Sequence, residues 1–237
     1  MTLRFIPLLV LTLLVGCVTT GTGTVPRKPA SGFDPNQIAK SDIDRVAEAH
    51  QREVFASLKM LAEKLYRRNP REWKKGGQPG LEAAVARIFE ANHEWKFAEL
   101  DNKRGTDAIH LAFREDFAGD RVLALIAGLG GMVMTAFNDK SELFILDDLD
   151  PQALFNAARN VEIAVWKLSN AHMPNGEPYL LSNEGAGPVR NLSFEREFGK
   201  VIGNLDLLSK IIADKTNHIV AKVVQNLATA IFLPVKF

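Results

Sequence analysis

Hydrophobic residues recur every three or four positions through most of the chain after residue 40, which is the spacing of one buried face of an α-helix. The pattern predicts helices over residues 41–68, 81–88, 106–117, 151–168 and 193–233. The last is one long helix or two collinear ones, because its apolar stripe lapses at residues 215–217. Several segments begin at a residue type that favours a helix N-cap, namely Ser41, Thr106, Asp150 and Ser193. The sequence therefore predicts a single all-α domain over residues 41–237, a helical bundle of about six helices.

Residues 122–137 form the most apolar stretch outside the N-terminus, with Thr135 as their one polar residue. A helix that is apolar on every side must be buried, either in protein or in lipid. The stretch is short for a membrane span. We therefore expect a buried central helix in which Gly128, Gly130 and Gly131 let neighbouring elements approach closely. Membrane insertion, or a break at Gly130-Gly131 into a hairpin, are the alternatives.

Residues 1–17 follow a different pattern, in which Arg4 precedes an apolar run over residues 5–15. A basic start before a short apolar run is typical of a secretory signal. The run closes with Leu14-Val15-Gly16-Cys17, which resembles the lipobox of bacterial lipoproteins. The resemblance implies cleavage between Gly16 and Cys17 and a diacylglyceryl thioether on Cys17, carrying palmitate or a similar acyl chain. An ordinary signal with a chance cysteine, or an uncleaved anchor, is the alternative.

Residues 17–40 are rich in glycine, threonine and proline and have no periodic apolar face, which predicts a flexible tether. The residue after Cys17 is Val18 rather than an aspartate. In lipoproteins of the enterobacterial type, which this segment resembles, that pattern implies transfer to the outer membrane. We therefore expect the helical domain in the periplasm, with the membrane as a partner through the N-terminal lipid.

Charged residues are nearly balanced, with 29 Lys and Arg against 28 Asp and Glu. Nucleic-acid binding needs a concentrated cationic face, so we expect no nucleic-acid partner. Because Cys17 is the chain's one cysteine, no intramolecular disulfide supports the domain. Its stability must come from a hydrophobic core, for which a hydrophobic content of 46% suffices.

Two short motifs suggest a metal site. Glu90 and His93 have the Glu-x-x-His spacing that places both side chains on one helix face in di-iron bundles, and Asp107 and His110 repeat it with a shorter acid. A di-iron site also needs a glutamate from each of two further helices. Because matches this short arise often by chance, we expect no metal and no cofactor, and a metal-dependent enzyme is an alternative hypothesis.

Other catalytic signals are weak. No serine lies in a Gly-x-Ser-x-Gly turn, and Gly128 to Gly131 lie inside an apolar run rather than in a phosphate-binding loop. Residues 173–191 carry three prolines and three glycines, and such a long irregular loop is a candidate functional surface.

A cluster of cations interleaved with Tyr66 and Trp73 is a candidate site for an anionic envelope ligand; it comprises Arg67, Arg68, Arg71, Lys74 and Lys75. Cations at a helix C-terminus also stabilise the helix dipole, and this explanation is equally consistent with the sequence.

Taken together, these patterns favour a non-enzymatic periplasmic protein, anchored by lipid, with a structural role or a binding role for a protein or envelope partner. The alternatives are a lipid-handling or membrane-active module that uses residues 122–137, and the metal-dependent enzyme described above.

The lipid anchor is directly testable. Replacing Cys17 by serine removes the thiol that accepts the diacylglyceryl group, so we expect the C17S chain to incorporate no labelled palmitate. We also expect it to leave the membrane fraction when cells are fractionated. A C17S chain that is processed and fractionates as the wild type does would contradict the lipobox interpretation.

Overall fold

The computed structural model describes residues 40–183 and 191–236, in which the secondary-structure elements are helices, and His172 and Pro178 form an isolated β-bridge. The signal segment, Gly16, Cys17 and almost all of the tether lie outside the described residues. The helices are α1 (Asp42–Arg68), α2 (Pro70–Lys75), α3 (Leu81–Phe89), α4 (Thr106–Ala112), α5 (Arg121–Ala136), α6 (Pro151–Asn170) and α7 (Ser193–Thr216). A short 3₁₀ helix, η2 (Ala98–Leu100), precedes α4. The predicted all-α class is confirmed. Helix α2 is additional to the predicted helices, because residues 69–80 contain prolines and glycines that are typical of a loop.

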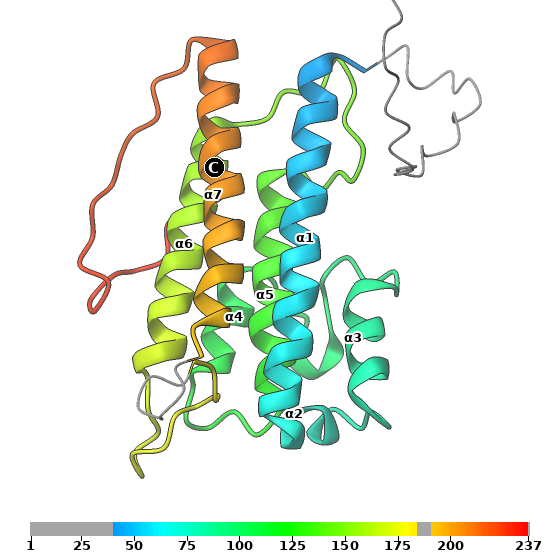
Figure 1. Cartoon of the computed structure of the whole chain (residues 1–237), viewed down its shortest axis with the longest axis vertical. Coiled ribbons are helices and arrows are strands. Elements are labelled where there is room, and N and C mark those ends of the chain that lie inside the picture. The colour runs from blue at the N-terminus through cyan, green and yellow to red at the C-terminus, as the bar shows by residue number, and fades with distance from the viewer. Residues whose placement is uncertain (1–39, 184–190, 237) are drawn as a thin grey trace, which may run out of the picture. The chain divides into compact units, whose positions relative to one another are not determined.

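The four long helices α1, α5, α6 and α7 run side by side with alternating directions (Figure 1). Helix α7 packs on both α6 and α1, while α5 packs on α1, α4 and α6. The short helices α2, α3 and α4 belong to the connection from α1 to α5. This arrangement is a four-helix bundle in which the connection from the first to the second long helix contains three short helices.

Side-chain caps begin three of the long helices. The Ser41 hydroxyl accepts a hydrogen bond from the Asp44 N–H, and the Asp44 carboxylate accepts one from the Ser41 N–H, so α1 starts with a reciprocal capping box. Asp120 caps α5 through the Leu123 N–H, and Asp150 caps α6 through the Gln152 N–H. The predicted caps at Ser41 and Asp150 are confirmed.

Two other predicted caps are wrong. Helix α4 has Gly105 at its N-cap, with a φ of 60° that glycine tolerates, and Thr106 is already helical. Helix α7 starts at Ser193, whose N–H donates to the Asn191 side-chain oxygen, so the asparagine supplies the acceptor expected from the serine. Helix α4 also ends at Ala112 rather than near residue 117.

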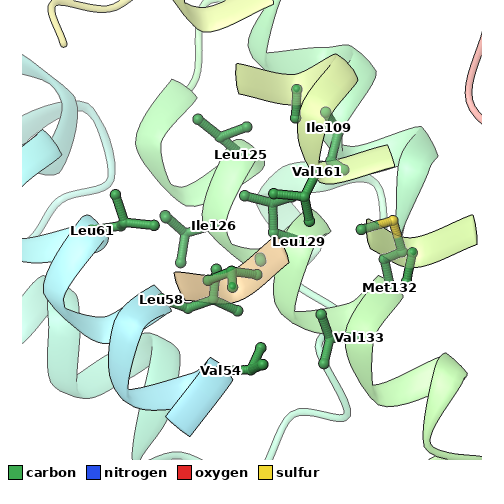
Figure 2. Close-up of a cluster of buried hydrophobic side chains, with 14 of the residues drawn as sticks. Val54, Leu58, Leu61, Ile109, Leu125, Ile126, Leu129, Met132, Val133 and Val161 are labelled. Atoms are coloured by element: carbon green, nitrogen blue, oxygen red, sulfur yellow. The ribbon is translucent and has the colours of Figure 1, made fainter. Parts of the chain in front are cut away.

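Helix α5 is the buried central helix that its composition predicted, and it is continuous through its glycines. All residues from Arg121 to Val133 are buried. Figure 2 shows Ile126 of α5 beside Leu58 and Leu61 of α1, and Leu129 of α5 next to Val161 of α6. Within the described residues no helix is long and apolar enough to cross a membrane. Burial inside protein therefore accounts for the apolar character of α5.

The glycines of α5 are points of close approach. A Cβ atom added at Gly128 would lie 2.7 Å from both the backbone nitrogen and the Cγ1 of Ile109 in α4. A Cβ at Gly130 would overlap the ring of Trp95, and one at Gly131 would lie 2.6 Å from Cγ of Arg104. Each glycine thus admits a different neighbour to the helix backbone.

The prediction of a helix beyond residue 216 is wrong. Helix α7 ends at Thr216, Asn217 adopts a left-handed conformation with φ of 52°, and residues 217–236 return alongside α6 without a helix (Figure 1). We call residues 217–236 the C-terminal segment.

Amide side chains of α6 hold this segment. Asn160 donates to the Leu233 carbonyl at 2.8 Å and accepts from the Leu233 N–H at 2.6 Å. Asn156 donates to the Pro234 carbonyl, and Gln152 exchanges two hydrogen bonds with Ala221. These side chains recur every four residues, so they form one ladder on α6 that binds an extended backbone.

Residues 144–146 are a short apolar run, of which residues 145 and 146 lie in an exposed turn. They belong to the connection between α5 and α6, and the Leu146 side chain is 90% exposed.

A matched pair of glycine substitutions tests the packing of α5. We expect Gly128→Ala to destabilise the protein by about 1–3 kcal/mol, because the new methyl group must displace the α4 backbone. Gly203 lies in α7 with no heavy atom within 4 Å of a new Cβ, so Gly203→Ala should stabilise the protein by about 0.5–1 kcal/mol through helix propensity. Urea unfolding of both variants measures the difference, and equal effects would show that α4 does not need close approach at Gly128.

Candidate functional site

A cavity of about 710 Å³, open on one side, is present in the described part of the chain. It lies between α1, the C-terminal end of α3, the loop that follows α3, and the C-terminal end of α5. The aromatic lining residues are Phe55, Phe89 and Trp95, and the charged ones are Arg52, Glu94, Lys96, Arg104 and Asp139. We call this hollow the aromatic cavity.

Trp95 connects the cavity to the core. Its ring stacks on Phe55 with centroids 5.3 Å apart and meets Phe89 edge-on at 5.9 Å. The same ring fits the notch that Gly130 leaves in α5. Its backbone has a φ of 62°, and the preceding residue Glu94 has a φ of 50°. A left-handed conformation is strained for a bulky side chain, so the ring contacts must stabilise the turn.

His93 fixes this turn through both ring nitrogens. Nε2 lies 2.9 Å from the Ile88 carbonyl oxygen, and Nδ1 lies 2.9 Å from the backbone nitrogen of Trp95. The carbonyl can only accept and the N–H can only donate, so the imidazole is neutral, with its proton on Nε2. Neither nitrogen is available to a metal or a substrate. His93 is therefore a positioning residue for Trp95.

The charged groups of the cavity lie largely in ion pairs. Arg104 pairs with Asp139, and Lys96 pairs with Glu94 at 3.2 Å. Arg52 has only a long contact of 3.9 Å with Glu48, and its side chain is 69% exposed. Arg52 thus offers the least compensated positive charge on the rim of the aromatic cavity.

The structure does not bring the four candidate metal ligands together. Glu90 pairs with Lys59 at 3.0 Å, and Asp107 is exposed at the start of α4. His110 meets the ring of Phe232 edge-on, and burial together with Lys167 lowers its pKa. No group of three or more His, Cys, Asp or Glu side chains capable of holding a metal occurs among the residues that the structure describes.

The cationic cluster at the end of α1 is less concentrated than its sequence suggests. Tyr66 is buried rather than interleaved with the cations, Lys75 pairs with Glu72 at 2.7 Å, and the Lys74 ammonium lies over the Trp73 ring. Arg67 shares a small surface hollow with three glutamates, namely Glu63, Glu82 and Glu90. Arg67, Arg71 and Lys74 are exposed, and Arg68 is half-buried. Binding of an anionic ligand by this cluster stays a prediction.

The described part of the loop over residues 173–191 is docked against α1. Asn69, at the end of α1, accepts from the Leu181 N–H and donates to the Leu181 carbonyl. The Tyr179 ring lies 4.9 Å from the Arg121 guanidinium carbon. The loop's expected role as a functional surface stays a prediction, and residues 184–190 lie outside the described structure.

A buried polar network at the start of α5 was not predicted from the sequence. The Tyr66 hydroxyl donates to Asp120 at 2.8 Å, and Glu72 of α2 accepts from the Arg121 N–H at 2.7 Å. The Arg121 guanidinium donates to the carbonyls of Ala112 and Arg114. Burial raises the pKa of Asp120 to about 6, against the opposing effect of its hydrogen bonds to Leu123 and Tyr66. Burial and the nearby Asp120 carboxylate raise the pKa of Tyr66.

No family model, curated protein sequence or solved structure that we compared with the chain matches it.

The raised pKa of Asp120 predicts a pH dependence of stability. A carboxyl that binds its proton more tightly in the folded state stabilises the fold at low pH, and this contribution is lost as the pH rises from about 4 to about 7. Asn is an equally good N-cap and does not titrate. We therefore expect Asp120→Asn to be more stable than the wild type at neutral pH by about 2–3 kcal/mol, with the gap closing near pH 4. Urea unfolding across this range measures it, and parallel curves for the two proteins would contradict the buried charge.

Proposed function

We propose that this chain is a lipid-anchored protein of the cell envelope whose helical domain binds a ligand in the aromatic cavity without chemical conversion. The ligand class that fits the lining carries an apolar or aromatic group and an anionic group. The anchor part of the proposal depends on the lipobox resemblance around Cys17, and the binding part depends on the cavity.

The observation that carries the binding part is the strained turn at Glu94 and Trp95. Left-handed bulky residues persist only where surrounding contacts maintain them, and they occur often at ligand sites. Here the contacts are the His93 hydrogen bonds, the stacking on Phe55 and the notch at Gly130. Together they present a preformed aromatic surface, which reduces the entropy cost of binding.

The polar groups of the cavity support the choice of ligand. Three cations and two carboxylates line it, so the charged side chains sum to a small positive excess. Arg52 is the cation with the weakest pairing, and it is exposed enough to meet an incoming anion. An apolar hollow with a few convergent polar groups is typical of small-molecule sites.

The same geometry supports binding over catalysis. His93 has both nitrogens engaged, and Asp139 and Glu94 are paired with cations. A membrane-active role for residues 122–137 has no support in the fold, because α5 is enclosed by α1, α4 and α6. We therefore do not propose it.

The dye 1-anilinonaphthalene-8-sulfonate combines an aromatic body with one anionic group and serves as a probe. We expect saturable binding of the dye, with Phe89→Ala weakening the affinity by about tenfold through lost apolar contact. Arg52→Gln should weaken it by about twofold to fivefold, with less effect at high salt.

Matched controls lie elsewhere on the bundle. Phe155 of α6 is also a half-buried phenylalanine, and Arg196 of α7 also has a long contact, 3.7 Å, with a glutamate on its own helix. Phe155→Ala and Arg196→Gln should leave dye affinity unchanged. Non-saturable binding, or equal losses in the control variants, would refute the cavity as the site.

A further inference from the structure

The C-terminal segment exposes more apolar surface than its surroundings require. Val224 is 97% exposed, Ile219 is 91% exposed, and Val223, Leu227 and Ile231 are exposed as well. In residues 219–231, which the structure describes in full, one backbone–backbone hydrogen bond occurs, from the Thr229 N–H to the Asn226 carbonyl. This stretch therefore has both apolar side chains and backbone groups free to be used elsewhere.

The order of residues in this stretch is that of an amphipathic helix. At about 100° per residue, the isoleucine, valine and leucine side chains fall within about 140° of arc. They are Ile219, Val220, Val223, Val224, Leu227 and Ile231, with Ala230 inside the same arc and Ala221 and Ala228 beside it. The polar residues Lys222, Gln225, Asn226 and Thr229 fall together on the opposite side. A segment that is extended in the fold thus carries a complete helical pattern.

The fold explains why this helix is absent from the free protein. A lone amphipathic helix on the outside of α6 would leave much of its apolar face in water, and short isolated helices are marginal in water. The left-handed residue Asn217 ends α7, and the Gln152 and Asn160 side chains bind the segment's backbone at Ala221 and Leu233. Between these two attachments a hollow of about 310 Å³ separates the stretch from α6.

The charge of the segment indicates what completes the helix. Residues 217–236 contain Lys222 and Lys236 and no aspartate or glutamate, in a chain whose charges are otherwise balanced. Within residues 219–231 the one charged residue is Lys222, and Lys236 follows the stretch. An amphipathic helix with positive charge and no acids is suited to an anionic lipid surface, where the apolar face enters the acyl boundary and Lys222 meets the head groups.

We propose that residues 219–231 form a helix on the surface of an anionic bilayer and attach the domain to it. The attachment points at Ala221 and Leu233 let the stretch between them fold on the membrane, either in place or after the Ala221 bonds open. This inference does not use the aromatic cavity, so the dye experiment and the membrane experiment can fail separately.

Vesicle flotation tests the proposal on residues 38–237. This range is a compact unit by its own contacts, and the buried side chains of the described structure lie within it. We expect it to float with vesicles of phosphatidylethanolamine and phosphatidylglycerol and to stay behind with vesicles of phosphatidylcholine alone. Backbone amides of residues 220–230 should gain protection from hydrogen exchange on the first kind of vesicle.

Exposed substitutions separate this surface from the rest of the chain. The double variant Ile219→Glu with Val224→Glu should lower the vesicle-bound fraction by at least about tenfold. Leu146→Glu is the matched control, because Leu146 is similarly exposed but lies between α5 and α6. The Leu146→Glu variant should bind vesicles as the wild type does. Equal losses in the control, equal binding to both vesicles, or flotation without amide protection would overturn the proposal. A change from dimer to monomer in the double variant, with no vesicle binding by the wild type, would instead identify a second copy as the partner and would also overturn it.

Discussion

Close approach to the backbone of α5 is the constraint on which the rest of the fold depends. The helix is enclosed on all sides, and its three glycines meet three different neighbours: α4 at Gly128, Trp95 at Gly130 and Arg104 at Gly131. Helices normally pack at 8–10 Å through side chains. Removing the side chains at these positions brings the connection between α3 and α4 onto the helix itself. The aromatic cavity exists because Trp95 and Arg104 reach that surface.

The start of α5 shows a second constraint, an electrostatic one. Glu72 and Asp120 both place carboxylates at this N-terminus, where the helix dipole favours negative charge. Burial of the Asp120 carboxyl disfavours its charged form. The raised pKa of Asp120 shows that this effect of burial outweighs the stabilisation of the negative charge by its surroundings. The benefit is geometric, because Glu72 fixes α2 and Tyr66 fixes α1 to the same helix end. Polar contacts thereby join α1 and α2 to the start of α5.

Periodicity was sufficient to predict the helices but not the contacts between them. The stripe from Ser41 onward, the all-round apolar character of α5 and the Asp150 cap were read correctly, because each depends on neighbours in sequence. The apolar stripe beyond residue 216 predicted a helix that the structure does not contain. Its pattern is helical, but amide side chains of α6, far away in sequence, bind the backbone of the C-terminal segment in an extended form. The spacing of His93 from Glu90 indicated a candidate metal ligand. Its role in positioning Trp95 depends instead on backbone dihedral angles that no residue pattern encodes. The network of Tyr66 with Asp120 likewise joins residues 54 positions apart.

The C-terminal segment and the four long helices differ in how they are held in the fold, because the amide ladder on α6 binds the backbone of the segment. Its contacts to Leu233 and Pro234 are hydrogen bonds that close chain loops of more than seventy residues. The four long helices share one apolar interior and must separate together, but the ladder can detach while that interior stays intact. Release of the C-terminal segment from α6 would therefore expose its backbone to a protease without requiring the four long helices to separate.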